Sequence, residues 1–418
     1  MTRDVVVVGG GPAGASTAAF LARLGRNVLV CEAARFPREK ICGEFLPPSV
    51  APRLERLGAL RDVEALAPRR PIGMAVVAPG GARVLGRFGA EAGPGYALRR
   101  PDLDAVLLRA ARRAGAEVLE ETRVTDVTPH PGGGYVLAVR TGSGETLTMR
   151  ARAIVGADGR NSLVARRLGL RRGAPRHRRF AVMGRFSGAR TPDDHGEMVV
   201  TADGYCGINP LPGGEANVCF VLDPRRAARA PEGIAPAPAG APLSQGFLPG
   251  RAHLERYVQW RIQSDPVVGQ RLAGARLEGP LAAVGPIACG SRRAVGDAAL
   301  LVGDAAEFFD PFTGEGVGTA LAAGEIAAET LDLALSRGDL SRRALSAYER
   351  RRRRTFAGRF RVDRALQRIL EHSGLTDFVA ARLERQPVLA DRLARVTAGL
   401  ASAGSLLRPD QVLRFLWA

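Results

Sequence analysis

Long apolar runs, lysine and tryptophan are scarce in this chain of 418 residues. No apolar run approaches the roughly 20 residues that a membrane-spanning helix needs. Val5–Val8 is too short for the core of a signal peptide and runs directly into glycines, so we expect a cytoplasmic protein. Lys40 is the only lysine, and Trp260 and Trp417 are the only tryptophans. These shortages bear on the choice between enzyme classes below.

Cysteine and histidine are also few. The five cysteines are odd in number and without close pairs, which fits a reducing compartment rather than a disulfide framework. The five histidines show none of the spacings of a metal site. The sequence therefore predicts a globular protein that has no disulfide framework and no metal centre.

Positive charge is in excess, with a net charge of +18 that is almost entirely due to arginine. Residues 341–418 hold seventeen arginines against seven acids, and Arg350–Arg354 is an unbroken run. Aromatic residues for base stacking are scarce there, so we expect solvated helix faces and no nucleic-acid partner. Attraction of the C-terminal helices to an anionic membrane surface is the alternative, and packing of these helices on the protein is favoured.

The N-terminal segment has the pattern of a dinucleotide-binding βαβ unit. A buried strand is expected over Asp4–Val8, followed by the glycine turn Gly9–Gly14 and a small-residue helix over Ala15–Leu24. A second strand over Asn27–Cys31 ends at Glu32. The glycines permit a tight turn and a close approach of backbone to a pyrophosphate, and the Glu32 carboxylate can accept hydrogen bonds from ribose hydroxyls.

Two later segments add to this dinucleotide-binding pattern. Asp158-Gly159 follows a buried strand over Ala153–Gly156, although such a turn alone is often only a helix cap. Gly303-Asp304 follows another buried strand, and the glycine-rich segment Pro311–Gly318 opens a long helix over Gly316–Leu335. An acid that can bind ribityl hydroxyls and a helix N-terminus beside a flavin ring predict one cofactor, FAD, that touches both ends of the chain.

The fold class that these patterns predict is α/β. A Rossmann-like FAD-binding domain over 1–70, 96–179 and 285–340 is interrupted by an antiparallel substrate-binding sheet over 71–95 and 180–284, and 341–418 is helical. In the middle part of the first domain, a small meander is expected from the alternating segments Glu117–Glu120, Arg123–Thr128, Tyr135–Arg140 and Thr146–Arg150. Antiparallel strands of the second domain are expected over Ala75–Val77, Phe180–Phe186, Glu197–Thr201, Tyr205–Asn209 and Asn217–Leu222. The segment Pro224–Gly250 is rich in proline, alanine and glycine and is interpreted as a loop or a lid.

In order and spacing, the three segments resemble the para-hydroxybenzoate-hydroxylase-like flavoproteins, which include group A flavin monooxygenases and geranylgeranyl reductases. Lys40-Ile41-Cys42-Gly43-Glu44 is similar to a segment of the geranylgeranyl-reductase-like branch that passes near the flavin. Arg100 corresponds to an FAD-contacting position by the same resemblance. The predicted FAD-binding residues are Gly9, Gly11, Pro12, Ala13, Gly14, Glu32, Lys40, Arg100, Asp158, Gly303, Asp304, Gly314, Gly316 and Val317.

Catalytic residues are less well indicated. Cys42 is either a thiol beside the flavin or a small residue that fits a tight approach, and the two interpretations stay equal. Glu44 and Arg185 are candidates for an acid, a base or an anion anchor, and structural ion pairing is the simpler interpretation. Asn209 and Phe312 are candidates for the substrate side of the pocket.

The function that the resemblance favours is NAD(P)H-dependent monooxygenation of an aromatic or polyketide-like small molecule through a flavin C4a-hydroperoxide. NAD(P)H would dock transiently, because no second glycine fingerprint exists for it. The alternative is a reductase of prenyl double bonds, although the branch's tryptophan is absent from Tyr205–Pro210. The superfamily that this chain resembles also includes flavin halogenases, which carry a Gly-x-Trp-x-Trp-x-Ile-Pro pattern and a catalytic lysine. A halogenase is therefore disfavoured by the scarcity of tryptophan and by the place of Lys40 in a cofactor segment. A non-catalytic flavin-binding redox sensor is a further alternative.

Overall fold

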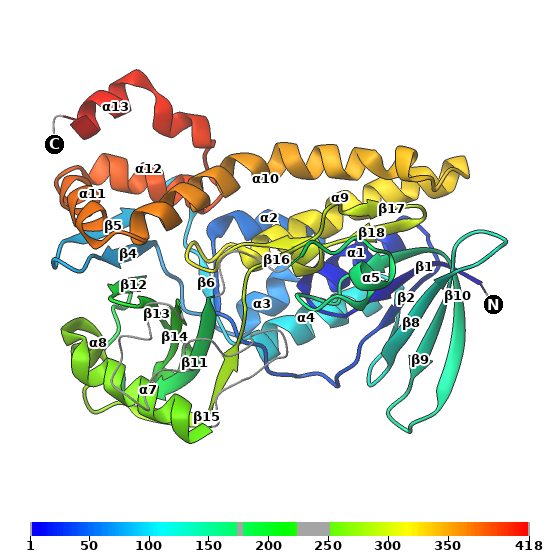
Figure 1. The fold of residues 1–418 in the computed structure, drawn as a ribbon, viewed down its shortest axis with the longest axis horizontal. Helices are drawn as coiled ribbons and strands as arrows, with labels where there is room; N and C mark the ends of the chain where they lie inside the picture. The colour runs from blue at the N-terminus through cyan, green and yellow to red at the C-terminus, as the bar shows by residue number, and fades with distance from the viewer. Residues whose placement is uncertain (1, 174–178, 224–250, 417–418) are drawn as a thin grey trace.

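The computed structural model describes residues 2–173, 179–223 and 251–416, which two large β-sheets and a set of C-terminal helices organise (Figure 1). The described helices are α1 (Pro12–Arg23), α2 (Ala51–Arg56), α3 (Leu60–Ala65), α4 (Arg100–Arg113), α5 (Leu163–Arg167), α7 (Arg251–Ser264), α8 (Pro266–Leu272), α9 (Gly316–Arg337), α10 (Arg342–Leu370), α11 (Ser373–Arg385), α12 (Pro387–Thr397) and α13 (Pro409–Leu416). None of the described helices has the length and apolar character that crossing a membrane requires.

The first sheet contains a parallel core in the order β18-β10-β1-β2-β7, extended by the antiparallel strands β17, β9 and β8. The strands of this sheet are β1 (Thr2–Val8), β2 (Val28–Cys31), β7 (Glu117–Leu119), β8 (Arg123–Pro129), β9 (Tyr135–Arg140), β10 (Thr146–Gly156), β17 (Val295–Gly296) and β18 (Ala299–Leu301). Val5–Val8 and Val28–Cys31 are buried, as expected of central parallel strands that are covered on both faces. The carboxyl ends of β1, β10 and β18 therefore meet at one edge.

Two details of the first sheet correct the sequence-based prediction. Thr146–Arg150 and Ala153–Gly156 are not separate strands but halves of β10, whose first half pairs with β9 and whose second half pairs with β1. The change from a mostly exposed pattern over Thr146–Arg150 to a buried one over Ala153–Gly156 resembles the boundary between two strands. Glu117–Leu119 pairs in parallel with β2, so it belongs to the core of the sheet rather than to a meander.

The second sheet has the order β15-β11-β14-β13-β12-β4-β5. Its strands are β4 (Gly73–Val77), β5 (Arg83–Arg87), β11 (Phe180–Ser187), β12 (His195–Thr201), β13 (Gly204–Pro210), β14 (Glu215–Leu222) and β15 (Arg276–Val284). All pairs are antiparallel except β4 with β12, which is parallel. The sheet is thus antiparallel as predicted, with one parallel pair, β4 with β12, which the long connection between these two strands permits.

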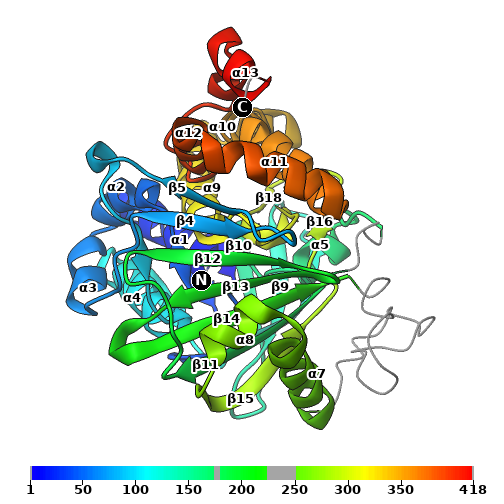
Figure 2. The same cartoon turned by 90° about the vertical axis from the view of Figure 1, so that its left-hand side faces the viewer.

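Helices cover one face and one edge of the second sheet (Figure 2). The outer face packs against α7 and α8 through apolar residues such as Tyr257 and Val268. The edge strand β5, which forms a hairpin with β4, lies beside α11 and α12. Carboxylates on these helices accept hydrogen bonds from backbone amides of the hairpin: Asp377 from Gly80, Glu384 from Arg83 and Asp391 from Arg87. Edge amides that would otherwise stay open for pairing with another chain are thereby occupied.

The C-terminal helices link the two sheets. Helix α9 packs on α1 beside the first sheet, and α10 follows α9 and continues to α11 and α12 beside the second sheet (Figure 1). Two short ladders, β3 (Phe45–Leu46) with β6 (Tyr96–Ala97) and β16 (Cys289–Gly290) with β19 (Glu307–Phe308), lie outside the two large sheets. The architecture confirms the predicted fold class. The predicted loop or lid Pro224–Gly250 lies outside the described residues.

Candidate functional site

Only glycine fits at two positions of the first turn. Gly9 has a φ of +100°, and a Cβ there would lie 2.6 Å from the carbonyl oxygen of Ala157. A Cβ on Gly14 would lie 1.9 Å from the carbonyl oxygen of Gly9. Helix α1 therefore starts directly against the end of β1, and no side chain caps its N-terminus at Gly11. Bare backbone with uncapped helix amides fits the diphosphate of a dinucleotide.

The three segments that the sequence singled out meet at this turn. The position of a Cβ on Gly9 lies 3.1 Å from the Cα of Asp158, and a Cβ on Gly303 would lie 2.9 Å from the Cβ of Ala13. Gly303 and Asp304 lie in a short 3-10 helix at the end of β18. Chain segments almost 300 residues apart thus form one edge, as an extended cofactor requires.

A group of cations surrounds the edge. Arg38, which the sequence analysis missed, has Nη2 3.4 Å from the position of a Cβ on Gly11, and Lys40 has Nζ 4.0 Å from that of a Cβ on Gly159. Desolvation lowers the pKa of Lys40, Asp304 opposes the shift, and Arg100, Arg38 and Arg160 add to it. Lys40 is nevertheless exposed to solvent and so does not belong to the core. Cations that repel one another at an accessible edge fit an anionic ligand.

Asp158 serves as a helix cap and also keeps one acceptor free. Its Oδ2 accepts hydrogen bonds from the amides of Leu163 at 2.6 Å and Val164 at 3.2 Å, while Ser162 caps the amide of Ala165. Burial raises the pKa of Asp158. Its Oδ1 is buried and has no hydrogen-bond partner among the described residues. A hydroxyl of a bound cofactor would satisfy this oxygen.

Glu32 and Arg100 are both held by the protein. The Glu32 carboxylate accepts hydrogen bonds from the amides of Gly10 at 2.7 Å and Ala34 at 2.8 Å, which ties the glycine turn to the end of β2. Arg100 donates to both carboxylate oxygens of Asp104 at 2.8 Å. Burial is the largest influence on Arg100 and opposes its charge, but Asp104 and Cys42 together outweigh burial and raise the pKa of Arg100. Because Arg38 also pairs with Asp104, at 3.1 Å, Arg100 and Asp104 together support Arg38. A direct contact of Arg100 with FAD stays a prediction.

The glycine-rich loop before α9 lies beside both sheets. A Cβ on Gly314 would lie 2.7 Å from the Phe45 ring, so the backbone at Gly314 leaves no room for a larger residue. Gly316 is exposed at the first turn of α9 and Val317 is buried. Phe312 makes an edge-to-face contact with Tyr205 of β13, with ring centroids 5.1 Å apart. The loop therefore lies between the cofactor edge and the second sheet.

Four of the five predicted catalytic candidates gather where the segment Lys40–Glu44 crosses the second sheet. Asn209 donates to the carbonyl oxygen of Gly43 at 2.9 Å, and Asn217, which the sequence analysis missed, donates to that of Cys42 at 3.0 Å. Arg185 donates to Glu44 at 2.6 Å and 3.0 Å. Phe312 lies apart from this group, with Tyr205. Glu44 and Arg185 thus form a buried ion pair that anchors the segment.

The face of the second sheet that turns toward the loop carries Arg185, Asn209 and Asn217 at one end, under the segment Lys40–Glu44, and is otherwise apolar and rich in sulfur. Along β14, Val218 and Phe220 belong to the outer cluster under α7, while Cys219 and Val221 belong to the inner one. The same alternation runs through β11, β12 and β13. We call this surface the inner face; the cluster that includes it comprises Ala181, Met183, Met198, Tyr205, Cys219, Val221 and Ile287, with Ile41, Met74, Val76, Val284, Phe308 and Phe312 at its margin.

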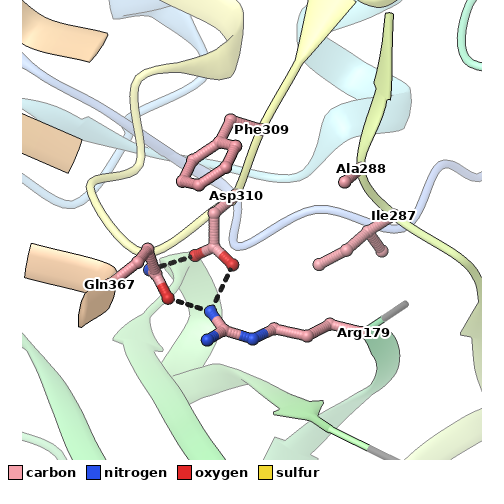
Figure 3. Close-up of a pocket in the computed structure, with 6 residues that line it drawn as sticks. All are labelled: Arg179, Ile287, Ala288, Phe309, Asp310 and Gln367. Atoms are coloured by element: carbon pink, nitrogen blue, oxygen red, sulfur yellow. Dashed lines mark hydrogen bonds and ion pairs between the residues drawn. The ribbon is translucent and has the colours of Figure 1, made fainter. Parts of the chain in front are cut away.

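A buried polar network fixes one end of the loop (Figure 3). Asp310 accepts hydrogen bonds from Arg179 at 2.8 Å, from Gln367 of α10 at 2.7 Å and from the Tyr205 hydroxyl. Burial raises the pKa of Asp310 although Arg179 and Tyr205 oppose the shift. The adjoining cavity, lined also by Phe309, has a volume of about 10 Å³. Because that volume holds at most about one water molecule, this cavity is not a substrate site.

Replacing Arg38 with glutamine is expected to weaken FAD binding. The change removes one charge-assisted contact to an anion, about 2 kcal/mol or roughly 30-fold in the dissociation constant. The matched control is R35Q, which removes an exposed arginine three residues away and should leave affinity unchanged. Titration of the apoprotein with FAD, followed by flavin fluorescence at two salt concentrations, measures both. Equal affinities of R38Q and R35Q would contradict the assignment of Arg38 to the diphosphate.

Comparison with known proteins agrees with FAD as the cofactor. A family model described as FAD binding domain matches residues 2–230. Among curated proteins, a menaquinone reductase of Mycolicibacterium smegmatis is 32% identical over 347 residues, which cover 78% of this chain and 76% of that protein. A digeranylgeranylglycerophospholipid reductase of Methanothrix thermoacetophila is 30% identical over 374 residues, covering 84% and 83%. A 1H-pyrrole-2-carbonyl-[peptidyl-carrier protein] chlorinase of Pseudomonas fluorescens is 26% identical over 373 residues, covering 83% and 79%.

The solved structures agree on the fold. A flavoprotein/dehydrogenase of Cytophaga hutchinsonii superposes with a TM-score of 0.82 at 21% identity, covering 100% of this chain and 98% of that one.

Among the described residues, no group of three or more histidine, cysteine, aspartate or glutamate side chains could hold a metal ion.

Proposed function

We propose that this chain, which belongs to the FAD binding domain family of flavin-dependent oxidoreductases, reduces an isolated carbon–carbon double bond in a polyprenyl chain. Two relatives carry the names of reductases, one of menaquinone and one of digeranylgeranylglycerophospholipid, and both of these molecules bear polyprenyl chains. Bound FAD would supply the hydride. The protein has to hold an apolar chain beside the loop that precedes α9 and keep water away from it.

The observation that carries the proposal is the inner face of the second sheet. Met183 of β11 and Met198 of β12 lie on it, together with Cys219 and Val221 of β14, which lies next to β11. Unbranched, polarizable methionine side chains adapt to irregular apolar ligands. An aromatic or phenolic substrate would instead call for polar groups that orient its ring. The chemistry of this surface therefore favours a hydrocarbon chain.

Most polar groups around the inner face are already engaged; the exceptions are the side-chain oxygens of Asn209 and Asn217, which are buried and have no hydrogen-bond partner among the described residues. Glu44 and Arg185 neutralise each other and bind the segment Lys40–Glu44. The Tyr205 hydroxyl donates to Asp310, and burial together with Asp310 raises the pKa of Tyr205 well above its usual value. The inner face thus holds a neutral phenol, whose proton lies between Tyr205 and Asp310.

The other reaction classes make different demands. Chlorination, which the name of one relative indicates, would require a lysine beside the substrate by the resemblance stated above. The only lysine, Lys40, lies beside Gly159 and Asp304 at the cofactor edge and is not part of the inner cluster. Monooxygenation with NAD(P)H, which the sequence favoured, stays a prediction that the following experiment separates from double-bond reduction.

The test is anaerobic incubation of the FAD-loaded protein with a chemical reductant and a polyprenyl lipid, with product analysis by mass spectrometry. We expect a saturated product that forms without oxygen. A product that forms only in air and contains an added oxygen atom would establish monooxygenation instead. A chlorinated product in the presence of air and chloride would establish the third class.

A substitution on the inner face ties this activity to the surface. Met198→Asp places a charge against the apolar chain and is expected to lower kcat/KM at least about 100-fold, or roughly 3 kcal/mol. Met198→Leu keeps volume and polarity and should stay within about threefold of the wild type. FAD content, measured by absorbance, should be equal in both variants. Unaltered turnover by M198D would show that the substrate does not bind at the inner face.

A further inference from the structure

Two acids, the buried Glu315 and the half-buried Asp363, lie near one arginine behind the loop that precedes α9. Glu315, the residue before α9, is 5% exposed, and Arg359 of α10 donates to its Oε1 at 2.9 Å. Asp363 lies one turn further along α10, and the nearby Thr313 side chain stabilises its charged form. The Oδ1 of Asp363 is buried and has no hydrogen-bond partner among the described residues. A proton on this pair would satisfy the free oxygen and reduce the excess of negative charge.

The electrostatic surroundings agree with the geometry. Burial raises the pKa of Glu315 to about 8, with Arg359 opposing the shift and Asp363 adding to it. Burial likewise raises the pKa of Asp363 to about 6, with Thr313 and Arg359 opposing the shift. The other charged groups that face the cluster are Arg53 of α2, Arg364 of α10 and Asp310 of the loop. None of them supplies Glu315 with a second hydrogen-bonding cation.

The pair is placed to respond to charge in the cofactor site. Thr313 and Glu315 flank Gly314, whose backbone packs against Phe45 at the narrowest part of the loop. Glu315 directly precedes Gly316, which is exposed at the N-terminus of α9. In a medium of low effective dielectric, negative charge that appears beside this loop raises the pKa of a nearby carboxyl.

We propose that Glu315 and Asp363 form a redox-linked proton site, which takes up one proton from solvent when the bound FAD accepts two electrons and releases it on reoxidation. The electrons come from whatever reduces the FAD, and the proton forms an O–H bond with a carboxylate oxygen, so no bond of the protein is broken. The inference rests on the FAD binding of the proposed function and not on the polyprenyl substrate.

The test is the pH dependence of the midpoint potential of the bound FAD, measured spectroelectrochemically without substrate. The slope reports the number of protons taken up with two electrons. Below about pH 8 Glu315 is protonated in both redox states, and above it only in the reduced state. Above about pH 8 we therefore expect the wild type to take up one more proton per two electrons, which makes the midpoint potential fall more steeply with pH. We expect E315Q to show no such gain. A gain of the same size in E315Q would overturn the proposal.

Two further variants make the result specific. Glu329→Gln removes an acid from an exposed glutamate–arginine pair between the same two helices, Glu329 with Arg351, and should behave as the wild type. Asp363→Asn removes negative charge beside Glu315, lowers the pKa of Glu315 and should move the onset of the gain toward lower pH. If E315Q fails to bind FAD, the result for D363N decides between the outcomes. Extra proton uptake that begins at the same pH in D363N as in the wild type would contradict the proposal. Absence of reductase activity on polyprenyl lipids would leave these measurements unaffected.

Discussion

Replacing Gly14 with alanine is expected to abolish FAD binding. The added Cβ would lie 1.9 Å from the carbonyl oxygen of Gly9, which is backbone and cannot rotate away. Either α1 moves off the end of β1 or the turn opens, and both changes displace the amides that face the diphosphate. Overpacking of this kind costs on the order of 3 kcal/mol of stability. We expect a loss of FAD affinity of at least about 100-fold, the equivalent of about 3 kcal/mol.

Gly374→Ala is the matched control for this prediction. Gly374 also lies in the first turn of a helix, α11, and a Cβ there would meet no heavy atom within 4 Å. Alanine is the better helix former by about 1 kcal/mol, so G374A should be neutral or slightly stabilising. Flavin content by absorbance and thermal unfolding of the apoproteins measure both effects. Normal FAD binding by G14A would show that the diphosphate lies elsewhere.

The cofactor edge could be predicted from the sequence because each part of it is local. The turn Gly9–Gly14, the acid Glu32 and the segment Gly303–Gly318 each carry residue types that backbone geometry requires within a few positions. That these segments meet was inferred from their common chemistry, and the contact of Gly303 with Ala13 shows that they do. Arg38 escaped notice because a single arginine among sixty basic residues carries no pattern.

The substrate side could not be predicted, because it depends on register and strand direction rather than on local pattern. Whether Met183 or Val182 lies on the inner face follows from the pairing of β11 with β14 and β15, and a shift by one residue would exchange them. Asn217 becomes a site residue only because that register brings it to the carbonyl oxygen of Cys42. For the same reason, no local sequence pattern indicates the parallel pairing of β4 with β12.

Replacing Glu44 with glutamine is expected to destabilise the protein by about 3 kcal/mol or more, because it removes half of a buried ion pair. Glu44 is 1% exposed, and both of its carboxylate oxygens are fully used. Oε1 accepts from Arg185 and from the amide of Arg100, and Oε2 accepts from Arg185 and from Asn217. A glutamine retains one oxygen, so its NH₂ group would face two donors and leave them unsatisfied.

The same arginine supplies the control for this change. Glu39 accepts two hydrogen bonds from Arg185 at 2.9 Å, but its side chain is 66% exposed, so water can replace the lost contact in E39Q. We expect E39Q to cost less than about 1 kcal/mol. Urea unfolding of the two apoproteins gives the difference directly. Because Glu44 holds the segment Lys40–Glu44 against the second sheet, E44Q should also weaken FAD binding, whereas E39Q should not. Equal unfolding free energies for E44Q and E39Q would mean that the buried pair contributes no more than its exposed neighbour, and Glu44 would then be free to take part in the chemistry.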